Sequence, residues 1–202
     1  MVCGFVESSE FLFAPVFRSL PRLLIDRADA DEVSALISST VKEILLLAEK
    51  ATLGSELMLG RLMEMLFVEM LRRYARRLPS GTTGWFAALN DPILTRAMQL
   101  VHTDPARRWT VEDLARGAGT SRTVLANRFN GVMGQAPIEY VTSWRMQIAA
   151  DRIRNGGDSL AAIAADVGCE SEAAFNRAFK RVTGVTPGRW RVGNATAGDA
   201  RM

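Results

Sequence analysis

Two short amphipathic runs near the end of the chain are separated by a glycine. In the first run, Leu160, Ile163 and Val167 recur at helical spacing, and Gly168 ends the run. In the second run, the apolar positions are Phe175, Ala178, Phe179 and Val182. Glycine tolerates the positive φ that a tight turn between two helices requires. The pattern therefore predicts a helix-turn-helix unit over residues 159–191.

The same pattern occurs a second time, upstream of this unit. Leu114, Ala115 and Gly119 match Ile163, Ala164 and Gly168 at an offset of 49 positions. Leu125, Phe129, Gly134 and Pro137 match Phe175, Phe179, Gly184 and Pro187 at an offset of 50. The one-residue difference falls in the turn, where an insertion leaves both helices intact. We therefore expect two helix-turn-helix units within residues 91–192.

The second unit carries a distinctive set of residues, namely Gly168, Glu170, Ser171, Phe175, Arg177, Ala178, Phe179, Lys180, Gly184, Pro187 and Arg191. With them the chain resembles the AraC/XylS family of bacterial transcription regulators. The resemblance implies a DNA-binding domain in which two helix-turn-helix units are joined by a long helix. The expected fold class is mainly α, with this domain at residues 91–192, a helical hairpin before it and a short β remnant at the start.

A helix of about 18 residues is expected between the two units, because Pro137 favours a helix start and Asn155-Gly156-Gly157 a helix end. At about 1.5 Å per residue it would be about 27 Å long. Its expected apolar stripe consists of Ile138, Val141, Trp144 and Ile148. Tyr140, Arg145 and Ala149 match family positions, which we interpret as packing and orientation. The helix would hold the two units at a fixed spacing.

In the family, the second helix of each unit enters the major groove, and this implies two sets of DNA-binding residues. The first set is Arg122, Thr123, Ala126, Asn127 and Arg128, and the second is Glu172, Ala173, Asn176, Arg177, Lys180 and Arg181. Asn127 is suited to adenine, Thr123 and Ala126 to a thymine methyl group, and Arg177 to guanine. For Arg122 and Arg128, phosphate contact or plain exposure to solvent remains an alternative to base contact.

Polar residues mark the starts of several predicted helices. Asp91-Pro92 precedes the apolar stripe of the first helix of the DNA-binding domain. Thr110 can cap the next helix, with the acidic Asp113 three residues on. Ser55 can cap the second helix of the hairpin. We therefore expect side-chain caps at Ser55, Asp91 and Thr110.

The first half of the chain predicts a helical hairpin over residues 31–78. Its second helix is apolar over more than one face, so it needs cover on two sides. We expect a homodimer through residues 31–78. The alternatives are cover by the missing sensor domain and a simple intramolecular hairpin with a large core. We interpret residues 79–90 as a linker, because PSGTTG is rich in turn residues. Residues 193–202 are expected to form a disordered tail.

The first 30 residues resemble the end of the cupin-type sensor domain found in one branch of the family. The segment that carries this likeness is CGFVESSEFLFAPVFRSLPRLL. Such a sensor is much longer, so the expectation is a remnant that lacks an effector pocket. A regulator that responds to no small molecule follows from this, through either a shortened gene or a start site placed too far downstream.

Composition and charge narrow the function further. The chain has 202 residues and is 48% apolar, enough for a real core. Residues 91–202 hold 15 Lys and Arg against 11 Asp and Glu, so this half is the candidate partner for double-stranded DNA. No apolar run reaches the roughly 18 residues that span a bilayer. We expect a cytoplasmic protein without membrane contact.

No catalytic site is expected. The one histidine, His102, lies near the end of a helix, where a histidine at the edge of a core is the ordinary interpretation. The two cysteines, Cys3 and Cys169, follow no metal-ligand spacing, so we expect neither a metal nor a cofactor.

The predicted function is therefore a sequence-specific DNA-binding transcription regulator. RNA polymerase is a further candidate partner, and the operator and the sign of regulation stay open. The alternative is a truncated protein-interaction module that pairs with full-length regulators or polymerase and has no operator of its own.

Overall fold

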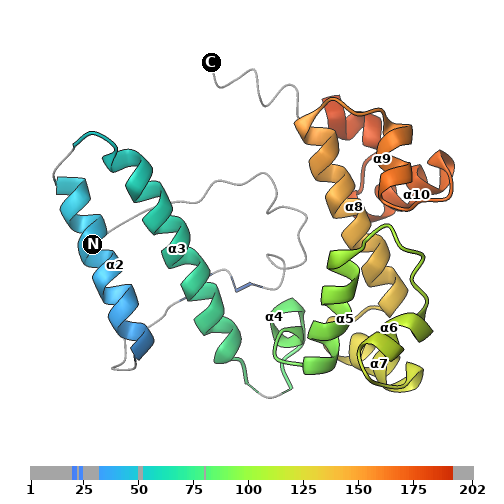
Figure 1. The fold of residues 1–202 in the computed structure, drawn as a ribbon, viewed down its shortest axis with the longest axis horizontal. Coiled ribbons are helices and arrows are strands. Elements are labelled where there is room, and N and C mark those ends of the chain that lie inside the picture. Colours follow the sequence, from blue (N-terminus) through green and yellow to red (C-terminus); the bar gives the residue numbers. More distant parts are fainter. Residues whose placement is uncertain (1–19, 22, 25–31, 50–51, 80, 193–202) are drawn as a thin grey trace. The chain divides into compact units, whose positions relative to one another are not determined.

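The computed structural model describes residues 20–21, 23–24, 32–49, 52–79 and 81–192. They fall into two compact units, one of which holds the hairpin of residues 32–79 and the other residues 81–192. All regular elements in these residues are helical (Figure 1). The mainly α fold class is confirmed. The predicted β remnant and the tail lie outside the described residues, except residues 20–21 and 23–24, which are not in a strand.

The first unit is a hairpin of α2 (Glu32–Glu49) and α3 (Ser55–Arg76). Gly54, with a φ of 85°, is the N-cap residue of α3, so the expectation that Ser55 caps this helix is wrong. Gly54 takes up the left-handed conformation that reverses the chain, so α3 already begins at Ser55 and not after it. The Ser55 hydroxyl accepts the N–H of Thr52 at 2.9 Å and thereby closes the connecting turn.

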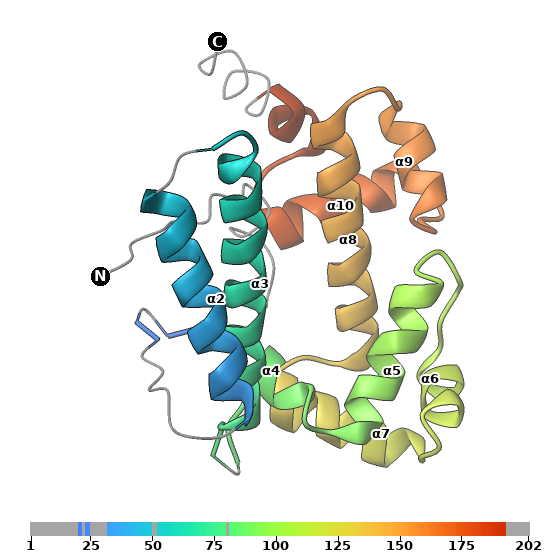
Figure 2. The ribbon, with the colours of Figure 1, turned by 60° about the vertical axis from the view of Figure 1, so that its left-hand side comes forward.

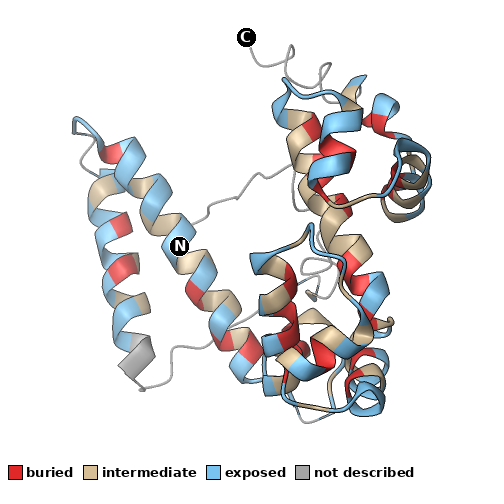
Figure 3. Ribbon diagram, turned by 45° about the vertical axis from the view of Figure 1, so that its right-hand side comes forward, coloured by how far each residue is buried: buried red, intermediate tan, exposed pale blue. Residues whose placement is uncertain are grey.

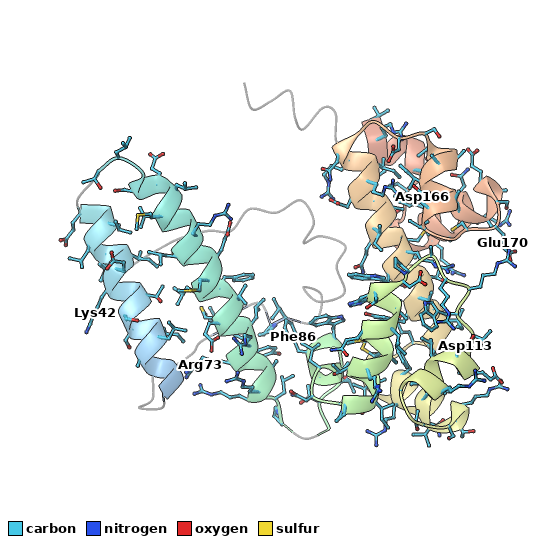
Figure 4. All side chains as sticks on the ribbon, viewed as in Figure 1. Lys42, Arg73, Phe86, Asp113, Asp166 and Glu170 are labelled. Carbon is cyan, nitrogen blue, oxygen red and sulfur yellow. The ribbon has the colours of Figure 1, made fainter. Side chains whose placement is uncertain are left out.

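Much of the hairpin's apolar surface is open to solvent. The exposed apolar residues of this unit include Leu36, Leu45, Leu46, Leu53, Leu57, Met58, Met65 and Val68. In Figure 4, Lys42 marks α2 and Arg73 marks α3, and side chains project outward along both helices. The structure therefore leaves apolar residues of α3 open to solvent, and Val68, for example, is 54% exposed.

The second unit begins with the short helix α4 (Trp85–Ala88). The helices that follow are α5 (Pro92–Thr103), α6 (Val111–Gly117) and α7 (Arg122–Arg128), and α7 continues into the π-helical turn η1 (Phe129–Met133). The long helix α8 (Pro137–Asn155) leads to α9 (Leu160–Asp166) and α10 (Glu172–Thr183), and residues 187–192 are also helical. Two helix-turn-helix units, α6–α7 and α9–α10, thus flank α8.

The expected caps of this unit are present. Asp91 accepts the N–H groups of Ile93 and Leu94 at 3.0 and 3.2 Å. Thr110 and Asp113 form a reciprocal capping box, in which each side chain accepts the other residue's backbone N–H. These bonds satisfy backbone donors that a helix start otherwise leaves open.

Each helix-turn-helix unit has its own hydrophobic core. The first core contains Leu94, Val101, Leu114, Leu125, Phe129, Tyr140 and Val141. The second contains Met146, Ala149, Ile153, Ile163, Val167, Phe175, Phe179 and Trp190. The Trp190 indole N–H donates to the Ala150 carbonyl at 3.1 Å, which ties residues 187–192 to α8. Figure 3 shows the buried residues of this unit in red on the helices around both cores.

The long helix α8 serves both cores. Its N-terminal half packs Tyr140 and Val141 into the first core, and its C-terminal half packs Met146 and Ile153 into the second. Figures 1 and 2 show α5, α6 and α7 near the start of α8, and α9 and α10 beside its later turns. The expected single stripe is therefore wrong: Ile138 is exposed, and Trp144 and Ile148 are only partly buried. A helix that contacts two cores on different sides has no single apolar face.

Candidate nucleic-acid interface

The second helix of the first helix-turn-helix unit, α7, is the first candidate recognition helix. The Ser121 hydroxyl caps it by accepting the N–H of Val124 at 3.3 Å. Leu125 and Phe129 are completely buried, as the sequence predicts. Of the predicted DNA-binding residues on this helix, Arg122, Thr123, Asn127 and Arg128 are exposed and Ala126 is partly buried. The outer face of α7 thus offers amide, hydroxyl, methyl and guanidinium groups.

Both arginines of α7 are bound to acidic residues of their own unit. The guanidinium of Arg122 forms an ion pair with Glu112 on α6. Arg128 donates to the other carboxylate oxygen of the cap residue Asp91 at 2.5 Å. The Asp91 side chain is only 10% exposed, whereas the Arg128 side chain is 48% exposed. Both pairs fix α7 against a neighbouring helix and partly neutralise its positive charge.

The second helix of the second helix-turn-helix unit, α10, is the second candidate recognition helix. Ser171 caps it, since its hydroxyl accepts the N–H of Ala174 at 3.2 Å. Phe175 and Phe179 are completely buried and anchor the helix in the second core. The predicted contact residues Glu172, Ala173, Arg177, Lys180 and Arg181 are exposed, and Asn176 is partly buried. The sequence therefore predicted correctly which faces of both helices point inward.

The two recognition helices differ in their available charge. Among the residues that the structure describes, Arg177, Lys180 and Arg181 have no ion-pair partner, in contrast to Arg122 and Arg128. Unpaired exposed cations attract a polyanion more strongly than cations already paired with a carboxylate. Of these two helices, α10 therefore carries more positive charge without an acidic partner among the described residues.

A cavity of about 600 Å³ lies between the loop before α6, the helix α8 and the helix α10. Its basic and aromatic lining includes Arg108 and Trp109 from the loop, Arg145 from α8, and Arg177 and Arg181 from α10. Arg108 also forms an exposed ion pair with Glu170, at 3.5 Å, in the turn before α10, where Glu170 is labelled in Figure 4.

Arg108 and Trp109 were missed by the sequence analysis. Their signal is the run Arg107-Arg108-Trp109 directly before the cap Thr110, in which the Arg107 guanidinium lies 4.2 Å from the centroid of the Trp109 ring.

His102 lies in an aromatic cluster between α5 and α8. Its Nε2 is 2.7 Å from the Tyr140 hydroxyl, and its ring stacks on Trp144 with the centroids 3.8 Å apart. Burial lowers the pKa of His102, and burial also raises the pKa of Tyr140 well above its usual range. A neutral imidazole wedged between two aromatic rings of α8 is a packing group. The interpretation of His102 as a histidine at the edge of a core is confirmed.

Asp113 and Cys169 also have shifted pKa values. The hydrogen bonds from Thr110 lower the pKa of Asp113, which favours the charged carboxylate of the capping box. Burial raises the pKa of the Cys169 thiol, so this cysteine is protonated at neutral pH. Neither shift points to catalysis, since each belongs to a local structural contact.

Within the described part of the chain, no cluster of three or more potential metal-binding side chains occurs. None of the described helices is both long and apolar enough to cross a membrane.

Two family models match the chain. A model described as a helix-turn-helix domain matches residues 114–192, and a model described as a cupin matches residues 1–76. The second match includes both helices of the α2–α3 hairpin.

Several transcription regulators are similar in sequence. An AraC-like transcription regulator of Streptomyces lividans is 45% identical over 139 residues, which are 69% of this chain and 46% of that protein. The HTH-type transcriptional regulator AlkR of Acinetobacter baylyi is 28% identical over 179 residues, which are 88% of this chain and 58% of that protein. The chain thus spans about half the length of the curated relatives it matches.

Solved structures share the fold. A transcriptional regulator with an AraC-type DNA-binding domain from Chromobacterium violaceum matches with a TM-score of 0.51 at 25% identity, over 54% of this chain and 96% of that chain. ToxT from Vibrio cholerae matches with a TM-score of 0.53 at 18% identity, over 90% of this chain and 65% of that chain. At this low identity the second likeness shows the fold alone.

Proposed function

Because this chain belongs to the AraC family of transcription regulators, we propose that residues 81–192 bind double-stranded DNA sequence-specifically and that the bound protein regulates transcription. One observation carries the proposal: α7 and α10 are each anchored in a separate core and each presents polar or basic side chains to solvent. In a helix-turn-helix unit, the second helix lies in the major groove and contacts base edges.

The two recognition helices are suited to successive segments of the major groove on one face of the duplex. The linking helix α8 has 19 residues, and at about 1.5 Å per residue it is about 28 Å long. Successive major-groove segments on one face are about 34 Å apart. The offset of α7 and α10 from the ends of α8, together with bending of the DNA, makes up the difference.

Specific contacts are divided between the two helices. On α7, Asn127 is the candidate contact to adenine, and Thr123 and Ala126 are candidates for a thymine methyl group. On α10, Arg177 is the candidate contact to guanine, because arginine can donate to both acceptors of its major-groove edge. Glu172, Ala173 and Asn176 share this helix and complete the proposed base-contacting set.

Phosphate contacts fall mainly to Lys180 and Arg181, whose exposed charges have no acidic partner among the described residues. Arg122 and Arg128 have a different role in this proposal. Their ion pairs with Glu112 and Asp91 orient α7, and any contact that they make to a phosphate is secondary.

The proposal extends to the rest of the protein. The α2–α3 hairpin forms a homodimer, so that two copies place four recognition helices on one operator. RNA polymerase is the further partner if the bound protein activates transcription. The site of action is the cytoplasm, where bacterial DNA lies, and no step of this function involves catalysis.

A mobility-shift titration of the full chain tests the proposal. Operator duplexes are first selected from a random library and then compared with scrambled duplexes at several salt concentrations. A specific regulator retains its preference as salt rises, whereas non-specific electrostatic binding is lost. Equal affinity for selected and scrambled duplexes would contradict the proposal and favour a protein-interaction module.

The variant Arg177→Ala sharpens this test. Loss of a base contact costs about 1–3 kcal/mol at the preferred site and relaxes one base position. Lys180→Ala is the matched control on the same helix, and we expect it to weaken binding without changing the base preference. An unchanged base profile for Arg177→Ala would remove this residue from base contact.

A further inference from the structure

We propose that Arg145 is a positioning residue that fixes the orientation of the two helix-turn-helix units and thereby determines the spacing of the DNA half-sites. The inference rests on the proposed function. The observation behind it is a set of four hydrogen bonds, which we call the Arg145 bridge. Through these bonds one side chain of α8 binds backbone carbonyls of both helix-turn-helix units.

Three bonds of the Arg145 bridge reach the loop before α6, in the first helix-turn-helix unit. The Nε group donates to the Pro105 carbonyl at 2.7 Å, and one terminal nitrogen donates to the Ala106 and Arg107 carbonyls at 3.3 and 2.8 Å. The other terminal nitrogen donates to the Gly168 carbonyl at 3.1 Å, in the turn of the second unit. A single guanidinium therefore connects the loop before α6 with the turn between α9 and α10.

The two units also touch directly at this point. A Cβ atom added to Gly168 would lie 2.3 Å from the Ala106 carbonyl oxygen, and Gly168 has a φ of +76°. Glycine is required here for two reasons, since a side chain would be strained in this conformation and would collide with backbone. The turn of the second unit thus lies against the loop of the first, and Arg145 binds carbonyls on both sides of the contact.

Only arginine has the geometry for this bridge. Its planar group carries five N–H donors in a fixed fork, whereas lysine has a single ammonium on a flexible stem. Arg145 is partly buried and faces carbonyl groups. Its charge is therefore used within the protein, and the bridge does not depend on a phosphate.

The cores explain why the bridge controls orientation more than folding. Leu114, Leu125 and Phe129 form one core, and Ile163, Phe175 and Phe179 form the other. Neither core contains Arg145. Without the bridge, each helix-turn-helix unit keeps its own core, and the two are joined by α8, by the contact at Gly168 and by the exposed ion pair between Arg108 and Glu170.

The test compares Arg145→Lys and Arg145→Ala with the matched variant Arg152→Lys. Arg152 lies on the same helix, and among the described residues its ion pairs are with Asp158 and Asp166 of the second helix-turn-helix unit, each at 2.9 Å. Asp166 is labelled in Figure 4. A half-site here is the DNA segment bound by one recognition helix. The affinity of each full-length protein is measured for duplexes that carry one half-site, or two half-sites separated by a varied number of base pairs.

We expect the wild type and Arg152→Lys to prefer one spacing by tenfold or more, which is within the range of typical coupling between sites. Both Arg145 variants should lose most of this preference and keep their affinity for a single half-site. An unchanged spacing profile would overturn the inference. Recovery of the profile by Arg145→Lys would do so too, because it would show that only the charge matters.

A second measurement needs no DNA. Residual dipolar couplings of the backbone amides report whether two units share one orientation. We expect a single alignment tensor for both units in the wild type and two different tensors in Arg145→Lys. One shared tensor in the variant would overturn the inference even if DNA binding were specific, whereas two tensors combined with non-specific binding would contradict only the proposed function.

If the Arg145 variants fail to fold, Gly168→Ala provides the decision. Its added Cβ pushes the turn at Gly168 away from the loop at Ala106, so the preferred spacing of the DNA half-sites should shift to a new value. The inference fails if Gly168→Ala folds and keeps the wild-type spacing.

Discussion

Arg128 and Asp91, 37 positions apart in the sequence, are joined by a hydrogen bond of 2.5 Å between guanidinium and carboxylate. The same carboxylate caps α5 through the N–H groups of Ile93 and Leu94. The start of α5 and the end of α7 are therefore held by one acidic side chain. An arginine that appeared in the sequence as a candidate DNA contact has a structural partner inside its own unit.

From this pair we predict that Arg128→Ala destabilises the protein by about 1–2 kcal/mol, because it leaves a mostly buried carboxylate without its cation. Arg122→Ala is the control, since the pair with Glu112 is far more exposed and should contribute less than about 1 kcal/mol. Urea unfolding of the full chain measures both. Equal, small effects of the two substitutions would contradict a structural role for Arg128.

The unequal charges of α7 and α10 predict unequal salt dependence of DNA binding. Each lysine or arginine that neutralises a phosphate contributes about one unit to the slope of log K against log salt. Lys180→Ala and Arg181→Ala should each reduce the slope by about this amount, whereas Arg122→Ala should leave it nearly unchanged. A large change with Arg122→Ala would mean that DNA displaces Glu112 from its ion pair.

The sequence predicted the helices of residues 81–192 closely, because the local signals in this part of the chain agree with one another. Asp91-Pro92 and the pair Thr110 and Asp113 begin helices in the structure as they do in the pattern. The internal repeat identified the core positions Leu125 and Phe175 on both recognition helices. Caps and periodicity act over a few residues, so they can be seen without a fold.

What the sequence could not show depends on contacts between distant segments. Arg145 meets the carbonyl of Pro105, 40 positions away, and that of Gly168, 23 positions away. No spacing rule marks these partners, because backbone carbonyls occur at every position. The exposure of Ile138 has a similar origin, since α8 turns different faces to two cores and a search for one stripe averages over both.

His102 predicts a dependence of stability on pH. Burial lowers its pKa from the ordinary value of 6.5, so the unfolded chain takes up a proton before the folded chain does. The free energy of unfolding should therefore decrease as the pH falls below about 6.5 and show no contribution from this group above neutrality. Asp113 does not interfere, because its pKa is lowered from an ordinary value of 3.8.

The variant His102→Gln isolates this effect, since glutamine can still hydrogen-bond to Tyr140 and does not titrate. Thermal melts of both proteins at about pH 7.5 and about pH 5.5 provide the comparison. We expect the wild type to lose more stability between these two values than the variant. An equal loss in both would assign the pH dependence to other groups.

The hairpin predicts a homodimer, and the exposed side chains of α3 identify where to disrupt it. Leu57 and Val68 are 69% and 54% exposed in the single chain. Contiguous exposed apolar surface is typical of an interface between subunits. Leu57→Gln combined with Val68→Thr should therefore convert the protein from dimer to monomer in sedimentation equilibrium at micromolar concentration, and its helix content should not change. Arg61→Gln is the control on the same helix, because in the described part of the chain Arg61 forms an ion pair with Glu64 alone, at 2.8 Å and exposed to solvent. A wild-type protein that is already monomeric, or a double variant that stays dimeric, would exclude this surface of α3 as the interface.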